Sequence, residues 1–318
     1  MYTYPQNLVK VIDKVLPSLA ASYEHCDLCI RRCGVNRLKG EKGFCSAPSK
    51  VMYYNYNPHH GEEPPLSGTK GSGTIFFSRC NMSCIYCQNW QFSQNDNGIE
   101  TTTEELARIM IGLQNTGCHN INLVSPTHFV PSIVEAIRHA SLNGLKIPIV
   151  YNTGGYDSLH IIKLLEGIVD IYLPDMRYSK NDAAVKYSKA PGYTQNNRLV
   201  VKEMARQTGK LKLSPAGIAL RGIIIRLLIL PNGISGTEAT MDFIANEIGP
   251  DTYLSVMSQY YPAYMANRSQ DLARRITLHE YDSIMQKLEA LSLSNGWVQP
   301  FECDFDPHFA GENFLPAR

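Results

Sequence analysis

The chain has 318 residues, 44% of them hydrophobic, and its 30 Lys and Arg against 29 Asp and Glu leave a net charge of +1. This balance excludes a small disulfide scaffold and a strongly basic nucleic-acid binder, and no apolar stretch reaches the roughly 20 residues that a membrane-spanning helix needs. Residues 1–24 mix Lys10, Asp13 and Lys14 with apolar residues and lack the features of a secretory signal. They predict an amphipathic helix in a cytoplasmic protein.

The cysteines are clustered in a way that indicates metal binding. Seven of the nine lie in two short groups, and an odd total in a chain without a secretory signal favours metal thiolates over disulfides. The other two, Cys118 and Cys303, are isolated, which is typical of small buried cysteines.

The first group occupies an N-terminal segment without helical or strand periodicity. Its pattern, C-x2-C-x3-C-x11-C, supplies four thiolates, from Cys26, Cys29, Cys33 and Cys45. Four thiolates suit either a tetrahedral zinc ion or a [4Fe–4S] cluster, and the pattern leaves both open. A loop rich in Pro, His and Glu follows at 57–68, so residues 1–72 are expected to form an N-terminal helix and a metal-binding extension.

From about residue 73 the sequence alternates between short apolar runs and segments with helical periodicity, which is typical of a parallel sheet. The predicted strands are 74–78, 121–125, 147–152, 169–174, 222–230 and 252–258. The predicted helices are 101–114, 129–143, 158–166, 198–208, 237–248 and 277–291, the first opened by a capping box of Thr101 and Glu104. We therefore expect an α/β fold, a partial barrel over 73–302 and a C-terminal tail at 303–318.

Polar and metal-binding residues follow the predicted strands. In parallel β/α barrels the loops after the strands meet at one mouth, where the chemistry takes place. The residues just past the first four strands are Cys80, Cys84 and Cys87, then Ser125 to His128, then Asn152 and Thr153, then Asp175 and Arg177. Loops are polar in any case, but this does not account for three cysteines at one strand end.

Those three cysteines follow the pattern C-x3-C-x2-C. A [4Fe–4S] cluster commonly takes four thiolates, so three local ligands leave one iron free to bind a substrate or a cofactor. The alternative is a structural zinc or an ordinary cluster, completed by a distant residue such as Cys118 or Cys303.

The segment CNMSCIYCQN resembles the cluster motif of the radical S-adenosylmethionine (SAM) superfamily. More narrowly, four segments resemble the pyruvate formate-lyase activating enzyme-like proteins of that superfamily: GEEPPLSGTKGSGTIFFSRCNMSCIYCQN, INLVSPTH, PIVYNTGGYD and VDIYLPDMRYS. The resemblance runs from about Cys26 to about Glu302. It implies the partial (β/α)6 barrel of the superfamily.

The resemblance also implies an activity and its cofactors. An oxidoreductase of this kind holds a [4Fe–4S] cluster on Cys80, Cys84 and Cys87, with SAM on the open iron. Reductive cleavage of SAM gives methionine and a 5′-deoxyadenosyl radical, which abstracts hydrogen from the substrate. The implied partners are an electron donor such as flavodoxin or ferredoxin and, as a protein substrate, a glycyl radical enzyme.

The same resemblance assigns roles near SAM. Tyr86 occupies an aromatic position that packs near adenine in many relatives. Many members carry Gly-Gly-Glu after the second strand to hold the methionyl ammonium, where this chain has Ser125, Pro126 and Thr127. These residues either replace that contact or simply begin a helix, with Thr127 as its cap. His128 beside them is a candidate catalytic residue on the substrate side.

Two further pairs complete the predicted SAM site. Asn152 and Thr153 align with a polar pair that lines this site in relatives. Asp175 and Arg177 resemble the Asp-x-Lys of activating enzymes, with Arg in place of Lys. The alternative for the second pair is an exposed ion pair of little energetic weight.

Other functions remain open at the level of sequence. The same radical could modify a small molecule, a peptide or RNA, although the near-neutral charge argues against RNA. A protein that binds the cluster without catalysis would act as an electron carrier or a regulator. Membrane partners are not expected.

Overall fold

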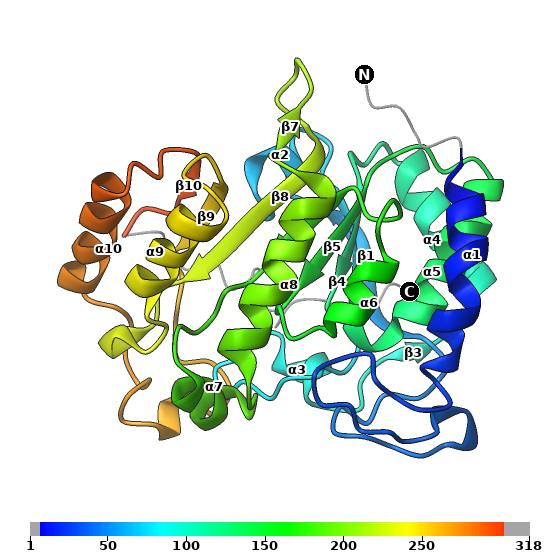
Figure 1. Cartoon of the computed structure of the whole chain (residues 1–318), viewed down its shortest axis with the longest axis horizontal. Helices are drawn as coiled ribbons and strands as arrows, with labels where there is room; N and C mark the ends of the chain where they lie inside the picture. Colours follow the sequence, from blue (N-terminus) through cyan, green and yellow to red (C-terminus); the bar gives the residue numbers. More distant parts are fainter. Residues whose placement is uncertain (1–6, 302–318) are drawn as a thin grey trace.

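The computed structural model describes residues 7–301, so Cys303 and the predicted tail at 303–318 lie outside the described residues. One mostly parallel sheet forms the centre of the molecule, with the strand order β10-β9-β8-β6-β5-β4-β2-β1-β3 and β7 paired to β8 (Figure 1). Within residues 7–301, no helix combines the length and the apolar character needed to cross a membrane.

Seven strands of the sheet run parallel to one another. They are β2 (Ser72–Phe77), β4 (Ile121–Val124), β5 (Ile149–Thr153), β6 (Ile171–Pro174), β8 (Ala219–Leu228), β9 (Tyr253–Met257) and β10 (Gly296–Val298). The first six are the predicted strands, and the predicted α/β class is confirmed. Strands β2, β4, β5 and β6 are buried at every residue, which explains their continuous apolar runs.

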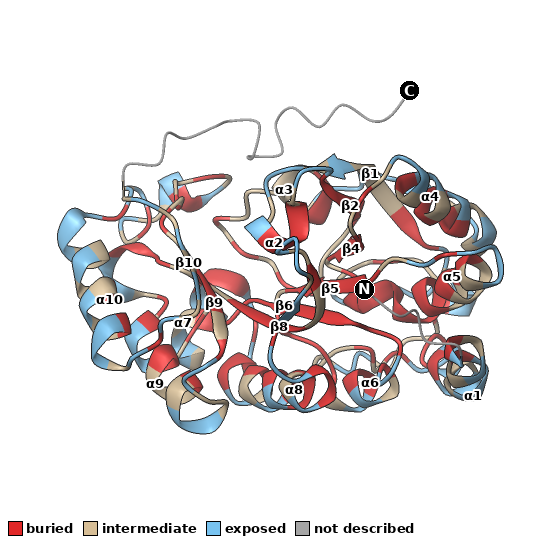
Figure 2. Ribbon diagram, turned by 90° about the horizontal axis from the view of Figure 1, so that it is seen from above, coloured by how far each residue is buried: buried red, intermediate tan, exposed pale blue. Residues whose placement is uncertain are grey.

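A helix connects each of these strands to the next, and the helices lie along the outer side of the sheet (Figure 2). They are α4 (Thr103–Asn115), α5 (Val130–Leu142), α6 (Leu159–Leu164), α8 (Tyr193–Thr208), α9 (Thr237–Glu247) and α10 (Leu278–Ala290). All six correspond to predicted helices. The amphipathic helix α1 (Leu8–Ala21) packs on α5.

The sequence did not predict the antiparallel strands β1 (Met52–His59), β3 (Ile99–Glu100) and β7 (Lys212–Leu213), nor helix α7 (Asn181–Ser188) and the single turns α2 (Pro64–Ser67) and α3 (Trp90–Ser93). Strand β1 pairs with the whole of β2, and its Asn and Pro residues, which are uncommon in strands, hid it. The loop predicted at 57–68 is therefore partly strand. Because β1 belongs to the central sheet, the structure joins residues 52–72 to the barrel sheet.

One predicted helix start is wrong by a residue. The N-cap of α4 is Thr102, whose Oγ1 accepts a hydrogen bond from the Glu105 amide at 3.2 Å. The sequence TTTEE offers a Thr followed three residues later by a Glu in two registers, so the pattern alone did not separate Thr101 from Thr102.

Candidate active site at the carboxyl ends of the strands

The three cysteines of the C-x3-C-x2-C motif lie on one loop between β2 and α3. Arg79 has φ +71° and turns the chain out of β2, and its amide donates to the Phe92 carbonyl at 2.8 Å, which closes the loop. Cys84 is buried, and Cys80 and Cys87 are half-buried. The loop therefore presents three sulfur atoms at the carboxyl end of the sheet.

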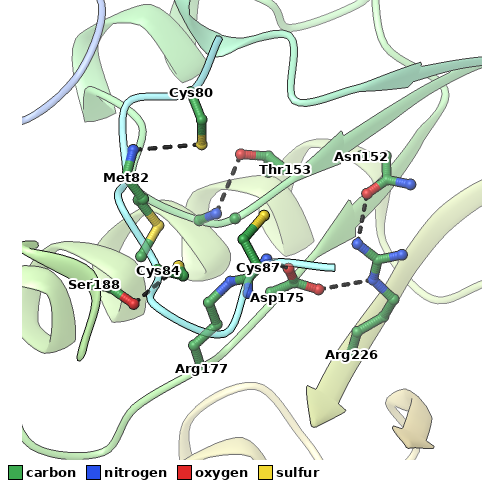
Figure 3. Close-up of polar contacts among 12 residues, drawn as sticks. Cys80, Met82, Cys84, Cys87, Asn152, Thr153, Asp175, Arg177, Ser188 and Arg226 are labelled. Carbon is green, nitrogen blue, oxygen red and sulfur yellow. Dashed lines mark hydrogen bonds and ion pairs between the residues drawn. The ribbon is translucent and has the colours of Figure 1, made fainter. Parts of the chain in front are cut away.

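Each of these sulfurs has a polar neighbour, and Figure 3 shows those of Cys80 and Cys84. The contacts are the Met82 amide to Cys80 Sγ at 3.4 Å, the Ser188 hydroxyl to Cys84 Sγ at 2.9 Å, and the Ser93 hydroxyl beside Cys87 Sγ at 3.2 Å. Burial raises the pKa of the Cys80 and Cys87 thiols, and the neighbouring Cys84 raises both further. Thiolates here therefore need a positive centre to hold them, which suits metal ligands.

The donor set fits an iron–sulfur cluster. Among residues 7–301, no three His, Cys, Asp or Glu side chains lie close enough to share one metal ion. In a [4Fe–4S] cluster each cysteine binds a different iron, so its ligands need not meet at one point. Cys80, Cys84 and Cys87 are the residues that would hold it.

Asp175 follows β6 and lies between two arginines (Figure 3). Arg177 Nη2 donates to its Oδ2, and Arg226 Nε, from β8, donates to its Oδ1 at 2.8 Å. Arg226 Nη2 also donates to Asn152 Oδ1 at 2.6 Å. Because Asp175 is only 6% exposed, the predicted alternative of an exposed Asp175–Arg177 pair is wrong.

Thr127 and Thr153 both donate to a buried carboxylate that the sequence analysis missed. Asp157 is fully buried, and it accepts from Thr127 Oγ1 and Thr153 Oγ1 at 2.7 Å each and from Tyr151 OH at 2.8 Å. Burial raises the pKa of Asp157, and the bonds from these hydroxyls lower it. The signal was present in the sequence, since Asp157 ends the segment NTGGYD. Thr127 does not cap α5, whose N-cap is Phe129.

Tyr86 belongs to a chain of hydroxyl groups that reaches the cysteine loop. Its OH lies 2.6 Å from Tyr178 OH, which lies 2.6 Å from Ser188 Oγ, the donor to Cys84. The ring also packs edge-on against Tyr260, with centroids 6.0 Å apart. Neither Tyr178 nor Ser188 was predicted, because only the tertiary fold brings α7 to this loop.

His128 lies behind the strand ends. It is 3% exposed, its Nε2 is 2.7 Å from the Ser78 carbonyl oxygen, and Arg37 Nη1 donates to its backbone carbonyl at 2.6 Å. Burial lowers the pKa of the imidazole to about 3. The ring faces the N-terminal cysteine segment, so its catalytic role stays a prediction. Ser125, with φ +56°, donates its amide to the Asn152 carbonyl at 2.8 Å.

The four N-terminal cysteines come together around one small cavity, whose lining includes Cys26, Cys29, Cys33, Cys45 and His128. The segment packs directly on the motif loop, because Arg31 Nε donates to the carbonyl of Asn81, the neighbour of Cys80, at 2.7 Å. None of the cysteines within residues 7–301 forms a disulfide, and Cys118 is buried as predicted.

A larger cavity of about 390 Å³ extends along the strands from the motif loop. Its lining includes Gln88 and Asn89 after Cys87, Asn152 of β5, Arg226 of β8, Ser255 of β9, and Glu62 and Glu63 before α2. The two glutamates belong to the loop predicted at 57–68. Arg226 is the charged residue of the otherwise apolar run 222–230.

Comparison with known proteins identifies the family. The model of the radical SAM superfamily matches residues 74–214. The uncharacterized protein MJ0674 of Methanocaldococcus jannaschii is 32% identical over 285 residues, which cover 85% of this chain and 76% of that protein. A second uncharacterized protein of that organism, MJ0808, is 23% identical and covers 80% of this chain and 78% of its own length. The chain belongs to the radical SAM superfamily.

Solved structures share the fold. The structure of Streptococcus suis SuiB bound to S-adenosylmethionine matches with a TM-score of 0.50 and 10% identity, over 76% of this chain and 52% of SuiB. The chain spans about half the length of SuiB and of the hydrogenase maturase HydG. Identity this low shows a common architecture and no more.

Proposed function

We propose that this protein cleaves SAM with a [4Fe–4S] cluster held by Cys80, Cys84 and Cys87. When bound, the cluster supplies the electron that splits SAM into methionine and a 5′-deoxyadenosyl radical, and this radical takes hydrogen from the substrate. The observation that carries the proposal is the set of three sulfurs on the β2–α3 loop, at the carboxyl end of the sheet in a radical SAM fold.

The residues around the loop supply binding and orientation. Arg177 and Asn152 present a cation and an amide at the strand ends, and Asp175 fixes the guanidinium of Arg177. Thr127 and Thr153 act through Asp157, which holds both hydroxyls in place. Ser125 and Tyr86 complete the set that would surround SAM.

The finer assignment is activation of a glycyl radical enzyme, with flavodoxin or ferredoxin as the electron donor in the cytoplasm. The resemblance of four segments to pyruvate formate-lyase activating enzyme-like proteins supports it. The second candidate is radical modification of a small molecule or a peptide, which the 390 Å³ cavity favours because it encloses a substrate of limited size.

A second metal centre on Cys26, Cys29, Cys33 and Cys45 is part of the proposal. The four thiols line one cavity and their segment contacts the motif loop, which supports a centre that braces this loop. A zinc ion, as a structural cross-link, would need the four sulfurs to move closer together than they lie among the described residues, whereas a second [4Fe–4S] cluster would bind each thiolate through a different iron and add a redox centre.

Anaerobic reconstitution with iron and sulfide tests the proposal. The protein is reduced with dithionite in the presence of SAM, and 5′-deoxyadenosine is measured. We expect product from the native chain and from Cys118→Ala, a buried cysteine outside both groups, and none from Cys84→Ala. Equal product from Cys84→Ala, or none from a native chain that carries its cluster, would refute the proposed SAM cleavage. The remaining interpretation would be a cluster-binding electron carrier or regulator.

A further inference from the structure

We infer that the large cavity binds its substrate through a cationic nitrogen, a protonated amine or a guanidinium group, with the Glu63 carboxylate as its partner. This inference rests on the proposed function, because it names the chemical class of substrate for the same site. It follows from the position of Glu63, its missing hydrogen-bond partner and the balance of charges around it.

The cavity runs between the motif loop and the Glu62–Glu63 turn. Gln88 and Asn89, directly after Cys87, line one part of it. The glutamates approach from the opposite end of the sheet, because His59 of β1 pairs with Ser72, the first residue of β2. Because Gln88, Asn89 and Glu63 line the same cavity, a molecule bound to Glu63 occupies the space next to the motif loop.

Among the described residues Glu63 forms no ion pair within 4 Å, and the charge of Arg226 acts on it only from a greater distance. Arg177 and Arg226 both bind Asp175, and Arg226 Nη1 also lies 3.7 Å from Glu62 Oε2. The Asn152 amide donates to Glu62 Oε1 at 3.4 Å. Three carboxylates thus face two guanidinium groups.

Glu63 itself is 7% exposed, and its Oε2 has no hydrogen-bond partner. A buried carboxylate oxygen without a donor costs free energy, which a ligand N–H group would recover. His59, a further titratable group on the cavity wall besides Glu62 and Arg226, has its pKa lowered by burial and by His60, which favours its neutral form. Trp297 adds an aromatic face of the kind that attracts cations.

Proton exchange gives the binding a measurable signature. Burial raises the pKa of Glu63 to about 7, although Arg226 pulls it down. Burial also raises the pKa of the neighbouring Glu62, so the two glutamates together retain a proton at pH 6, which a cation that binds to Glu63 must displace to the buffer. At pH 8 the carboxylate is already ionised, and the same binding releases almost no proton.

The experiment uses three probes of matched shape, 1-aminopentane, 1-pentanol and pentanoate, added to the reconstituted, SAM-loaded protein in a calorimeter. We expect the amine to bind about tenfold or more tightly than the alcohol and pentanoate to bind weakest, because a charge-assisted hydrogen bond is stronger than a neutral one. Buffers of different ionisation enthalpy at pH 6 would show proton release. The inference would be overturned if the amine and the alcohol bound with equal affinity. It would also be overturned if the amine bound more tightly than the alcohol at pH 6 but released no proton.

A pair of variants assigns the effect to Glu63. Glu63→Gln should abolish both the amine preference and the proton release, whereas Glu247→Gln, the same change at an exposed helix residue, should keep both. SAM affinity must stay unchanged in Glu63→Gln, because its loss would assign Glu63 to SAM itself and refute the inference. A lysine-containing pentapeptide compared with 1-aminopentane then separates a peptide side chain from a free amine. Failure of the native chain to form 5′-deoxyadenosine would instead count against the proposed function, whatever the amine binding.

Discussion

Ser188, the last residue of α7, donates a hydrogen bond to the sulfur of Cys84 at 2.9 Å, across 104 positions of sequence. Donors to cluster sulfurs stabilise the reduced state, because they offset its extra negative charge. The serine is fully buried, so bulk water does not compete with its hydroxyl for the Cys84 sulfur. This contact links α7 to the redox properties of the proposed cluster.

Ser188→Ala should therefore lower the midpoint potential of the cluster by something on the order of tens of millivolts, while the iron content stays the same. A redox titration followed by electron paramagnetic resonance measures it. Ser283→Ala, at a half-buried serine of α10 that contacts Glu238 far from the cysteine loop in the sequence, is the matched control and should leave the potential unchanged. An identical potential in Ser188→Ala would show that the contact does not tune the cluster.

Arg226→Met should destabilise the fold by about 3 kcal/mol, because it leaves buried carboxylates with fewer partners. Asp175 and Glu62, its partners at 2.8 and 3.7 Å, are both buried side chains. Urea unfolding measures the loss. Adding Glu62→Gln to Arg226→Met should restore part of the stability, since it removes one uncompensated charge, and strictly additive effects would contradict this coupling.

His128→Gln should change the pH dependence of stability. Burial lowers the pKa of His128 to about 3, below its unfolded value near 6.5, so the unfolded chain binds more protons between these values. The native protein should lose about 1.4 kcal/mol per pH unit from this residue as pH falls from 6.5, a slope that His128→Gln should lack. His160→Gln, at an exposed histidine, is the control.

The same variant tests the predicted catalytic role of His128. If the imidazole only ties the turn before α5 to the Ser78 carbonyl, His128→Gln will retain 5′-deoxyadenosine formation at neutral pH wherever it remains folded. A loss of hydrogen transfer to substrate in a folded, SAM-cleaving variant would instead support catalysis by His128.

Cys33→Ser should remove the N-terminal metal and leave the cluster of the motif loop in place. Cys33 is the exposed member of its group, so the substitution disturbs little packing. Iron and zinc are counted after reconstitution. A fall from about eight irons to about four would identify a second cluster, and loss of one zinc at constant iron would identify a structural zinc site. Unchanged metal content would exclude Cys33 as a ligand.

The parallel strands and the cysteine motif could be predicted from the sequence. Strands β2, β4, β5 and β6 are buried on both faces, so their apolar character is continuous and readable. The motif is equally readable, because Cys80, Cys84 and Cys87 share one short loop. Both the apolar strands and the cysteine motif are formed by residues that are close together in the sequence.

The contacts between side chains that are distant in the sequence emerge from the folded chain. The pairing of Arg226 with Asp175, the bond from Ser188 to Cys84 and the approach of Glu63 to the cavity each join separate elements. Strand β1 was hidden for a related reason, since its polar residues become a strand only by pairing with β2. Such contacts depend on strand register and on which face each residue turns inward, and a single chain's local pattern does not encode these across a hundred positions.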